Sequence, residues 1–138
     1  MGRRDTGTGA VLERMVLPAL EKGGYSYKRQ ICIGERLGGG SHFVDIVAEK
    51  GDDKVLISMK WQQVSGTAEQ KVPFEVICLE EALKTGSYRR AFVVLGGGGW
   101  KLRTFYAAGG LNEYLKGSGK VQILTLEAFV ARANMGKL

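Results

Sequence analysis

The sequence predicts an α/β fold, in which a mixed central sheet is flanked by helices. Three observations predict it. The apolar fraction is 44% and the charged fraction 25%, which is the balance of an ordinary globular domain. Stretches with helical and with two-residue periodicity follow one another in the order α-β-β-β-α-β, followed by a further α-β-α. Three successive strands, a crossover helix and a further strand require both antiparallel and parallel pairing.

The first half of the chain supplies a helix and three strands. Apolar residues at helical spacing indicate a helix over residues 9–22, ended by a glycine pair. A strand is expected over 25–33. Two further strands, 42–49 and 54–61, are joined by a Gly-Asp-Asp turn of the kind that closes hairpins. These three strands therefore form an antiparallel meander.

The second half continues with the crossover helix. Thr67 and Gln70 have capping-box spacing and predict a helix start at this point. Pro73 is unfavourable in a helix interior, so the main helix either starts there or is kinked there. An all-apolar run over 91–95 is typical of a buried strand. A short helix is expected over 105–116, a last strand over 121–124, and a final helix capped by Thr125.

Composition limits the class of protein. The chain has 138 residues, and no linker divides it, so one domain spanning 1–138 is expected. Its 20 Lys and Arg exceed 14 Asp and Glu, and the net charge of +6 favours a polyanionic partner. No apolar run approaches membrane-span length and no signal peptide is evident, so a cytoplasmic protein without a membrane partner is expected. Cys32 and Cys78 are expected as buried free thiols.

Two charged residues interrupt the apolar pattern of the central hairpin. Asp45 shares a strand face with Phe43 and Val47, and Lys60 shares a face of the next strand with Ser58. The opposite face of the first of these strands is expected to carry Val44, Ile46 and Ala48. A carboxylate among apolar side chains is costly unless it is paired or bound to a metal. A structural Asp45–Lys60 ion pair is one interpretation, and a catalytic pair is the other.

The stretches His42-Phe43-Val44-Asp45 and Ile57-Ser58-Met59-Lys60, with Glu13 on the first helix, carry a family resemblance. The chain resembles the PD-(D/E)XK nuclease superfamily, which includes restriction endonucleases and Holliday-junction resolvases. The resemblance covers residues 8–95 and implies a restriction-endonuclease-like core. In that family an Asp on the second strand is followed by an acid-x-Lys on the third.

The sequence departs from the family pattern at two positions. Val44 stands where the family has proline, and Ser58 stands where it has an acid. A serine is a poor metal ligand beside a carboxylate. In a subset of restriction endonucleases the missing glutamate comes from the following helix, and Glu75 lies close to that spacing. Glu69 and Gln62 are the alternatives.

The resemblance implies a Mg²⁺ site, at which Mn²⁺ is expected to substitute. Its metal ligands would be Asp45, Glu75 and Glu13, the last through water or at a second site, although Glu13 also fits a solvated helix carboxylate. Lys60 would orient or activate the attacking water. The implied catalytic set comprises Asp45, Lys60, Glu75, Glu13, Ser58 and Gln62.

Basic pairs and one polar loop are predicted to contact DNA. Each pair alone fits a solvated face, but together they fit a surface that tracks phosphates, with Trp61 and Trp100 available for packing or base contact. His42, the only histidine, fits a structural role as well. The predicted DNA-binding residues are Arg3, Arg4, Lys28, Arg29, Ser41, His42, Arg89, Arg90, Lys101 and Arg103.

The function implied is a Mg²⁺-dependent endonuclease acting on double-stranded DNA, of a restriction-like or phage and mobile-element type. A Holliday-junction resolvase is the alternative within the superfamily. A nuclease fold with a decayed site, kept as a DNA-binding module, is the alternative outside catalysis. A homodimer is expected, because cutting two strands needs two sites and the chain supplies one.

Overall fold

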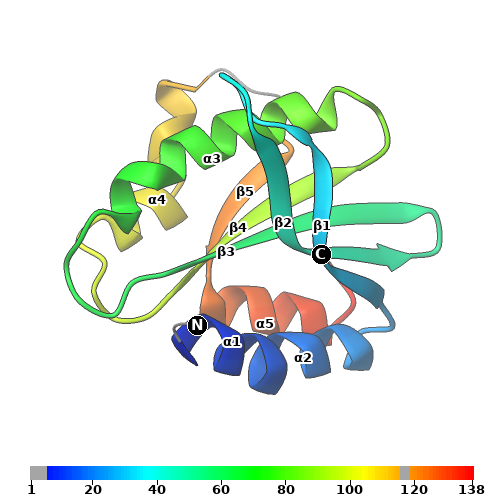
Figure 1. The fold of residues 1–138 in the computed structure, drawn as a ribbon. Coiled ribbons are helices and arrows are strands. Elements are labelled where there is room, and N and C mark those ends of the chain that lie inside the picture. Colours follow the sequence, from blue (N-terminus) through cyan, green and yellow to red (C-terminus); the bar gives the residue numbers. More distant parts are fainter. Residues whose placement is uncertain (1–5, 116–118) are drawn as a thin grey trace.

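The fold is built around a five-stranded sheet, seen in a computed structural model that describes residues 6–115 and 119–138 (Figure 1). The strands lie in the order β1-β2-β3-β4-β5, with β1, β2 and β3 antiparallel and β3, β4 and β5 parallel. Their bounds are β1 Ser26–Glu35, β2 Ser41–Lys50, β3 Asp53–Trp61, β4 Arg90–Gly96 and β5 Val121–Thr125. The predicted mixed sheet is confirmed.

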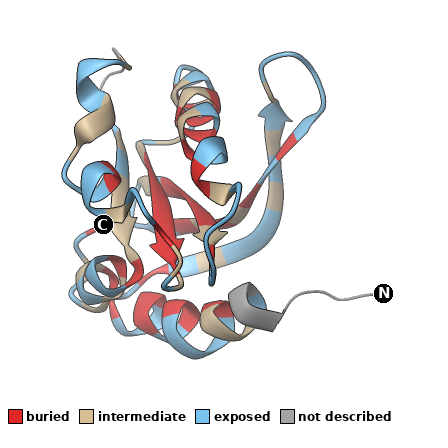
Figure 2. Cartoon of the chain, turned by 90° about the vertical axis from the view of Figure 1, so that its left-hand side faces the viewer, coloured by how far each residue is buried: buried red, intermediate tan, exposed pale blue. Residues whose placement is uncertain are grey.

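Helices cover the sheet on its two sides, as Figure 1 shows. On one side lie α1 (Thr6–Val11), α2 (Leu17–Lys22) and α5 (Leu126–Asn134), and on the other lie α3 (Ala68–Leu83) and the short α4 (Arg103–Ala107). One buried apolar cluster lies under each layer. Figure 2 shows buried positions gathered on the central strands and on the helix sides that face them. The predicted α-β-β-β-α-β order with flanking helices is confirmed.

The first helix is interrupted by a π-helical turn over Leu12–Val16, between α1 and α2. Pro18 follows this turn, in the first positions of α2. A proline has no amide hydrogen, and its ring clashes with the carbonyl four residues before it. The wider turn accommodates both effects, and single π turns of this kind are common at functional sites.

Pro73 lies inside α3, which begins at Ala68, so the helix does not start at this proline. The Thr67 side chain makes no capping hydrogen bond. Because Pro73 cannot donate to the carbonyl of Glu69, that oxygen is free to accept elsewhere. Tyr106 Oη donates to it at 2.7 Å. The proline thus provides the contact by which α4 is attached to α3.

Two smaller expectations are wrong. The helix expected over 105–116 is instead α4 followed by a 3₁₀ turn over Gly110–Glu113, because Gly109, at φ 84°, ends the first helix. Cys32 is exposed on the edge strand, whereas Cys78 is buried as expected. Of the two roles expected for Trp100, packing is the one observed, because the residue is buried and its Nε1 donates to the Gly96 carbonyl at 2.7 Å. None of the helices within the described ranges has the length and apolarity needed to cross a membrane.

The sheet opens at Asp45. The β2–β3 ladder runs from Lys50↔Asp53 to Ile46↔Ile57 and does not include the next pair, Asp45 with Ser58. Across β1, Gln30 has a positive φ of 53° and is missing from the β1–β2 ladder.

The alternation of faces along β2 inverts at the same point. Val44 packs in the cluster under α3, whereas Ile46 and Ala48 pack in the cluster under α2 and α5. The expectation that these three residues share a face is therefore wrong, because β2 is irregular at Asp45.

Candidate active site

Asp45 lies where the β2–β3 ladder stops, and its side chain rather than its backbone bonds to β3. Its Oδ2 accepts a hydrogen bond from the backbone N–H of Met59 at 2.6 Å. Its Oδ1 accepts from Gln30 Nε2 at 3.4 Å. The carboxylate is therefore fixed at the point where the two strands separate, and such irregularities often direct a side chain into an active site.

Glu75 faces this region from α3 and is only 2% exposed. Its Oε1 accepts from Arg36 Nη1 at 2.8 Å, and its Oε2 accepts from His42 Nε2 at 3.1 Å. Arg36 begins the turn between β1 and β2, and His42 is the second residue of β2. The helix thus brings its glutamate against the ends of β1 and β2 that rise toward α3 in Figure 1.

Lys60, the penultimate residue of β3, completes the group. Its ammonium makes no ion pair or hydrogen bond with other residues in 6–115 and 119–138. Its positive charge nevertheless lowers the pKa of both Asp45 and Glu75. Lys60 directly follows Met59, whose amide binds Asp45, and the described part of the chain leaves the donors of its ammonium unused.

The two carboxyl groups have opposite pKa shifts. Burial raises the pKa of Asp45, and the charge of Glu75 adds to this, against the Met59 amide and Lys60. Burial would also raise the pKa of Glu75, but the hydrogen bond from Arg36, the charge of Lys60 and the contact with His42 outweigh it and lower that pKa. Two neighbouring acids whose pKa values are pushed apart are typical of functional sites.

The donor set suits Mg²⁺. This ion prefers oxygen ligands and is usually held by one or two carboxylates, with waters and substrate phosphates completing its shell. The like charge of Glu75 raises the pKa of Asp45, and a bound cation would relieve this repulsion. In the residues that the structure describes, no cluster of three or more His, Cys, Asp or Glu is placed to hold a metal. The fit therefore rests on these two carboxylates.

A comparison with protein families decides the identity of the fold. A family model described as a PD-(D/E)XK nuclease superfamily domain matches residues 4–137. The chain belongs to the PD-(D/E)XK nuclease superfamily. The resemblance predicted from Asp45 and the Ser-x-Lys of β3 is confirmed.

Two solved structures are similar to this PD-(D/E)XK domain. The protein of unknown function AF1548 is 12% identical with a TM-score of 0.45, over 80% of this chain and 54% of its own. The small subunit R.BspD6I2 of the heterodimeric restriction endonuclease R.BspD6I is 18% identical with a TM-score of 0.41, over 89% of this chain and 69% of its own. This chain thus spans about half the length of the first. No curated protein matches it at a significant level.

Of the three predicted substitutes for the missing acid of this PD-(D/E)XK domain, Glu75 alone interacts with both Asp45 and Lys60. Gln62 instead donates through Nε2 to Glu69 Oε2 at 2.9 Å and to the Gly99 carbonyl at 2.8 Å. Glu69 is bound within that second network. Ser58 is 3% exposed at the opening of the sheet, where the family pattern has its acid.

Glu13 lies apart from the other predicted ligands. It is in the π-helical turn and forms an exposed ion pair with Arg29, with 3.5 Å between Oε2 and Nη1. Within the described part of the chain, its contacts do not include Asp45, Lys60 or Glu75. Its predicted role at the metal stays a prediction.

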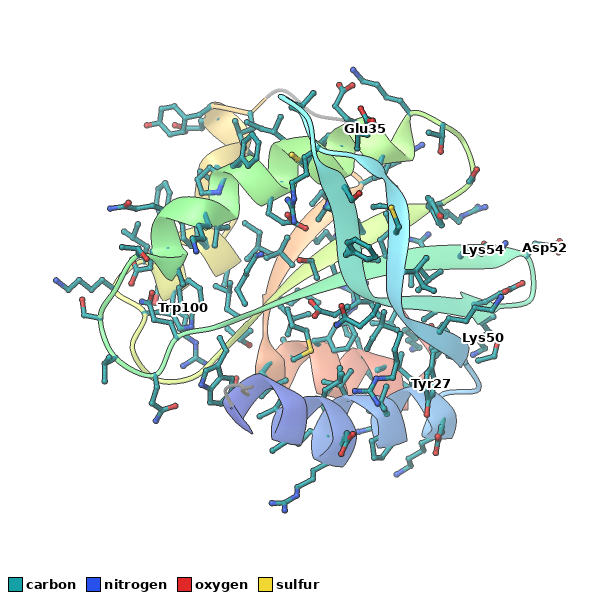
Figure 3. All side chains as sticks on the ribbon, in the orientation of Figure 1. Tyr27, Glu35, Lys50, Asp52, Lys54 and Trp100 are labelled. Atoms are coloured by element: carbon teal, nitrogen blue, oxygen red, sulfur yellow. The ribbon has the colours of Figure 1, made fainter. Side chains whose placement is uncertain are left out.

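The predicted DNA-binding residues are divided between two ends of the sheet. Arg90 pairs with Val55, and Leu95 pairs with Lys60, so these ends of β4 are about 16 Å apart. Arg89 lies beside Lys54, at the end opposite to Trp100 in Figure 3, and forms an ion pair with Asp53 at 3.3 Å.

Lys101 lies next to Trp100, at the Lys60 end of the sheet. Arg103 is in the same region and pairs with Glu127 at 2.8 Å. At the other end, Arg90 Nη1 donates to the Leu138 carbonyl at 3.0 Å. Only Lys101 and Arg103 of these basic pairs therefore lie at the end of β4 that carries Lys60.

Lys28 and Arg29 are exposed on β1, and Ser41 is exposed at the start of β2. Arg3 and Arg4 lie outside the described residues. His42 is 1% exposed, so it contacts Glu75 rather than presenting a surface to DNA.

Sequence reasoning missed Arg36 and Gln30. Arg36 stands directly before a glycine-rich turn and Gln30 is in the edge strand, and neither position marks a contact with an acid on another element. The glycine-rich turn could have indicated Arg36, because an arginine beside such a turn, next to a predicted site, is a candidate partner for the acids of that site.

Proposed function

We propose that this chain is a Mg²⁺-dependent endonuclease that hydrolyses phosphodiester bonds in double-stranded DNA, with Asp45, Glu75 and Lys60 as its catalytic residues. One observation carries the proposal. At the opening between β2 and β3, the Met59 amide holds the Asp45 carboxylate at 2.6 Å, directly before Lys60 in β3. The charges of Lys60 and Glu75 both affect the pKa of Asp45, which agrees with this placement. These three residue types, in this order along a superfamily nuclease domain, suit metal-assisted hydrolysis.

Each residue has a distinct role in this proposal. Asp45 is held by the Met59 amide, so its free lone pairs face a fixed position. Asp45 and Glu75 would hold Mg²⁺, which, when bound, lowers the pKa of a coordinated water and offsets charge on the attacked phosphate. Lys60 donates hydrogen bonds to the attacking water and to a phosphate oxygen. His42 is a positioning residue, because it binds Glu75 Oε2.

The proposal extends to substrate and assembly. The net charge of +6 favours nucleic acid over a neutral substrate. One domain of this family carries one site, so cutting both strands of a duplex calls for two copies, and we propose a homodimer. The restriction-like and mobile-element types would act on duplex DNA, whereas a Holliday-junction resolvase would act on a four-way junction.

Cleavage assays test the site. Supercoiled plasmid, linear duplex and four-way junction are incubated with Mg²⁺ or Mn²⁺. Asp45→Asn, Lys60→Gln and Glu75→Gln are each expected to lower the cleavage rate by about 100-fold or more, because each removes a group that binds the reacting atoms. Glu81→Gln is the matched control, since Glu81 lies on the same helix in an exposed pair with Lys84. Equal cutting by wild type and the three site variants would show that the site is elsewhere.

A second candidate function is a DNA-binding module without catalysis. Two observations favour it. Ser58 occupies the acid position, and both oxygens of Glu75 already have partners within the protein. This function predicts that the wild type binds all three DNA forms and cuts none with either metal. Cleavage that depends on Asp45 would eliminate it.

A further inference from the structure

Arg36 and Glu75 form an ion pair whose two side chains differ in solvent exposure. The Glu75 side chain is 2% exposed, and that of Arg36 is 31% exposed, with 2.8 Å between Oε1 and Nη1. The hydrogen bond raises the pKa of the guanidinium, which therefore keeps its charge throughout the physiological range. The buried carboxylate of Glu75 is thus paired with a cation that reaches solvent.

Besides the His42 contact, two basic side chains already match the two carboxylates of the site without a metal. Asp45 and Glu75 carry two negative charges, and Lys60 and Arg36 carry two positive charges close to them. A divalent cation bound to the same carboxylates would leave an excess of positive charge. Excess charge in a partly buried site is costly. Either a resident cation leaves, or an anion joins the site, and a DNA phosphate would do the latter.

Arg36 is the cation that can leave. It begins a turn in which Gly38, Gly39 and Gly40 all have positive φ values, from 87° to 105°. A Cβ built on any of these glycines would meet no atom within 4 Å, so open space surrounds the turn. Lys60, by contrast, is in β3, where its strand pairs with β4.

The turn is anchored through its main chain, and the Arg36 side chain contacts Cys78 on α3 besides Glu75. The Arg36 N–H donates to the Gly40 carbonyl at 2.8 Å, and the Gly39 N–H donates to the Arg36 carbonyl at 3.0 Å. These bonds involve main-chain atoms only. The guanidinium can therefore leave Glu75 by side-chain rotation, while β1 and β2 stay paired.

We propose that Arg36 occupies Glu75 in the metal-free protein, is displaced when a divalent cation binds there, and then contacts a phosphate of the bound DNA. A guanidinium suits both positions, because its planar fork of donors matches carboxylate and phosphate oxygens. Metal binding and DNA binding are then coupled through one side chain. The inference rests on the proposed function only in taking Glu75 as a metal ligand.

Metal binding without DNA tests the first step. The affinity of the full chain for Mn²⁺ is measured by electron paramagnetic resonance of the free ion. Arg36→Gln is expected to bind Mn²⁺ about tenfold more tightly, within the usual range of coupling between two ligands of one site. Glu75→Gln is expected to bind it more weakly. Lys84→Gln removes an exposed ion pair on the same helix and is expected to leave the affinity unchanged.

The outcomes separate this inference from the proposed function. If Glu75→Gln weakens Mn²⁺ binding but Arg36→Gln does not strengthen it, Arg36 is a structural partner and the displacement is wrong. If Glu75→Gln changes nothing, the proposed ligand set is wrong and the inference falls with it. Arg36→Lys keeps the charge with a single donor group, and an increase of about threefold is expected, so this variant tests the inference if Arg36→Gln does not fold.

DNA binding tests the second step. Duplex affinity is measured as a function of salt in the Lys60→Gln background, with and without Mg²⁺. With Mg²⁺, Arg36→Gln is expected to reduce the slope of log affinity against log salt by about one, the loss of one phosphate contact. Without Mg²⁺, the slope should not change, because Arg36 is then bound to Glu75. A loss of slope in both conditions, or in neither, would contradict the coupling.

Discussion

Helix α3 carries two buried glutamates about two turns apart, and their surroundings differ. Glu69, 7% exposed, accepts hydrogen bonds from the backbone amides of Lys101 and Leu102 and from Gln62 Nε2. Glu75, 2% exposed, accepts from the side chains of Arg36 and His42. The donors of Glu69 are neutral and mostly main chain, whereas Glu75 is held by side chains, one of them charged.

The difference separates a structural carboxylate from a candidate catalytic one. Backbone amides cannot move away, so Glu69 ties the loop after β4 to α3 and cannot accept a metal without breaking the fold. Arg36 can move away, and Lys60 adds a second positive charge near Glu75. A buried acid is therefore a better functional candidate when its partners are mobile and charged than when they are fixed.

The largest expected effect is on stability at Glu69. Glu69→Gln replaces an acceptor oxygen by an amide group that faces other N–H donors, and leaves buried backbone groups unpaired. We expect a loss of about 3 kcal/mol in the free energy of unfolding. Urea denaturation at pH 7 without divalent metal measures it.

Glu75→Gln is the matched comparison, with an expected loss of no more than about 1 kcal/mol. Its amide oxygen can still accept from His42, Arg36 can turn to water, and the repulsion with Asp45 is removed. If the two losses are equal, or their order is reversed, the distinction between a structural and a functional glutamate does not hold.

The next expected effect is a gain in the free energy of unfolding when Asp45 is replaced, whereas the replacements at Glu69 and Glu75 lower it. Its pKa lies above the ordinary value of 3.8, chiefly because of burial, so folding disfavours the ionised form. Asp45→Asn keeps an oxygen for the Met59 amide and removes the charge. We expect this variant to be more stable than wild type at pH 7 by about 0.5–1 kcal/mol, as is common when a functional charge is removed.

The pH dependence of this gain follows from the sign of the shift. As the pH falls through the raised pKa, folded wild type takes up the proton first and its penalty is relieved. Below 3.8 both states are protonated and the difference from Asp45→Asn disappears. Urea titrations from pH 7 down to about 4 should show a shrinking gap. A gap that widens toward acid would mean that Asp45 is stabilised as a charge, like Glu75.

The parts of the site that follow from local pattern were predictable from the sequence. The two-residue period of β3 places Lys60 and Ser58 on one side, and the helical stripe of α3 places Glu75 toward the sheet. The parts that depend on contacts between distant elements were not. The opening of the sheet at Asp45 involves Gln30 on β1 and Met59 on β3, and the Arg36–Glu75 pair joins the β1–β2 turn to α3. Likewise the helical pattern did not show that Glu69 is buried too, or that backbone amides of the loop after β4 bind it.

The smallest expected effect tests the remaining predicted ligand, Glu13. Glu13 forms an exposed ion pair with Arg29, with 3.5 Å between Oε2 and Nη1. It therefore has neither backbone donors like those of Glu69 nor a buried setting like that of Glu75. Glu13→Gln should change the free energy of unfolding by less than about 0.5 kcal/mol, since exposed pairs contribute little. The Mn²⁺ affinity should also stay unchanged if two carboxylates hold the ion. A weaker affinity, or a lower number of ions bound per chain, would instead show that the π-helical turn supplies a third carboxylate, and the site would then have to close around the metal.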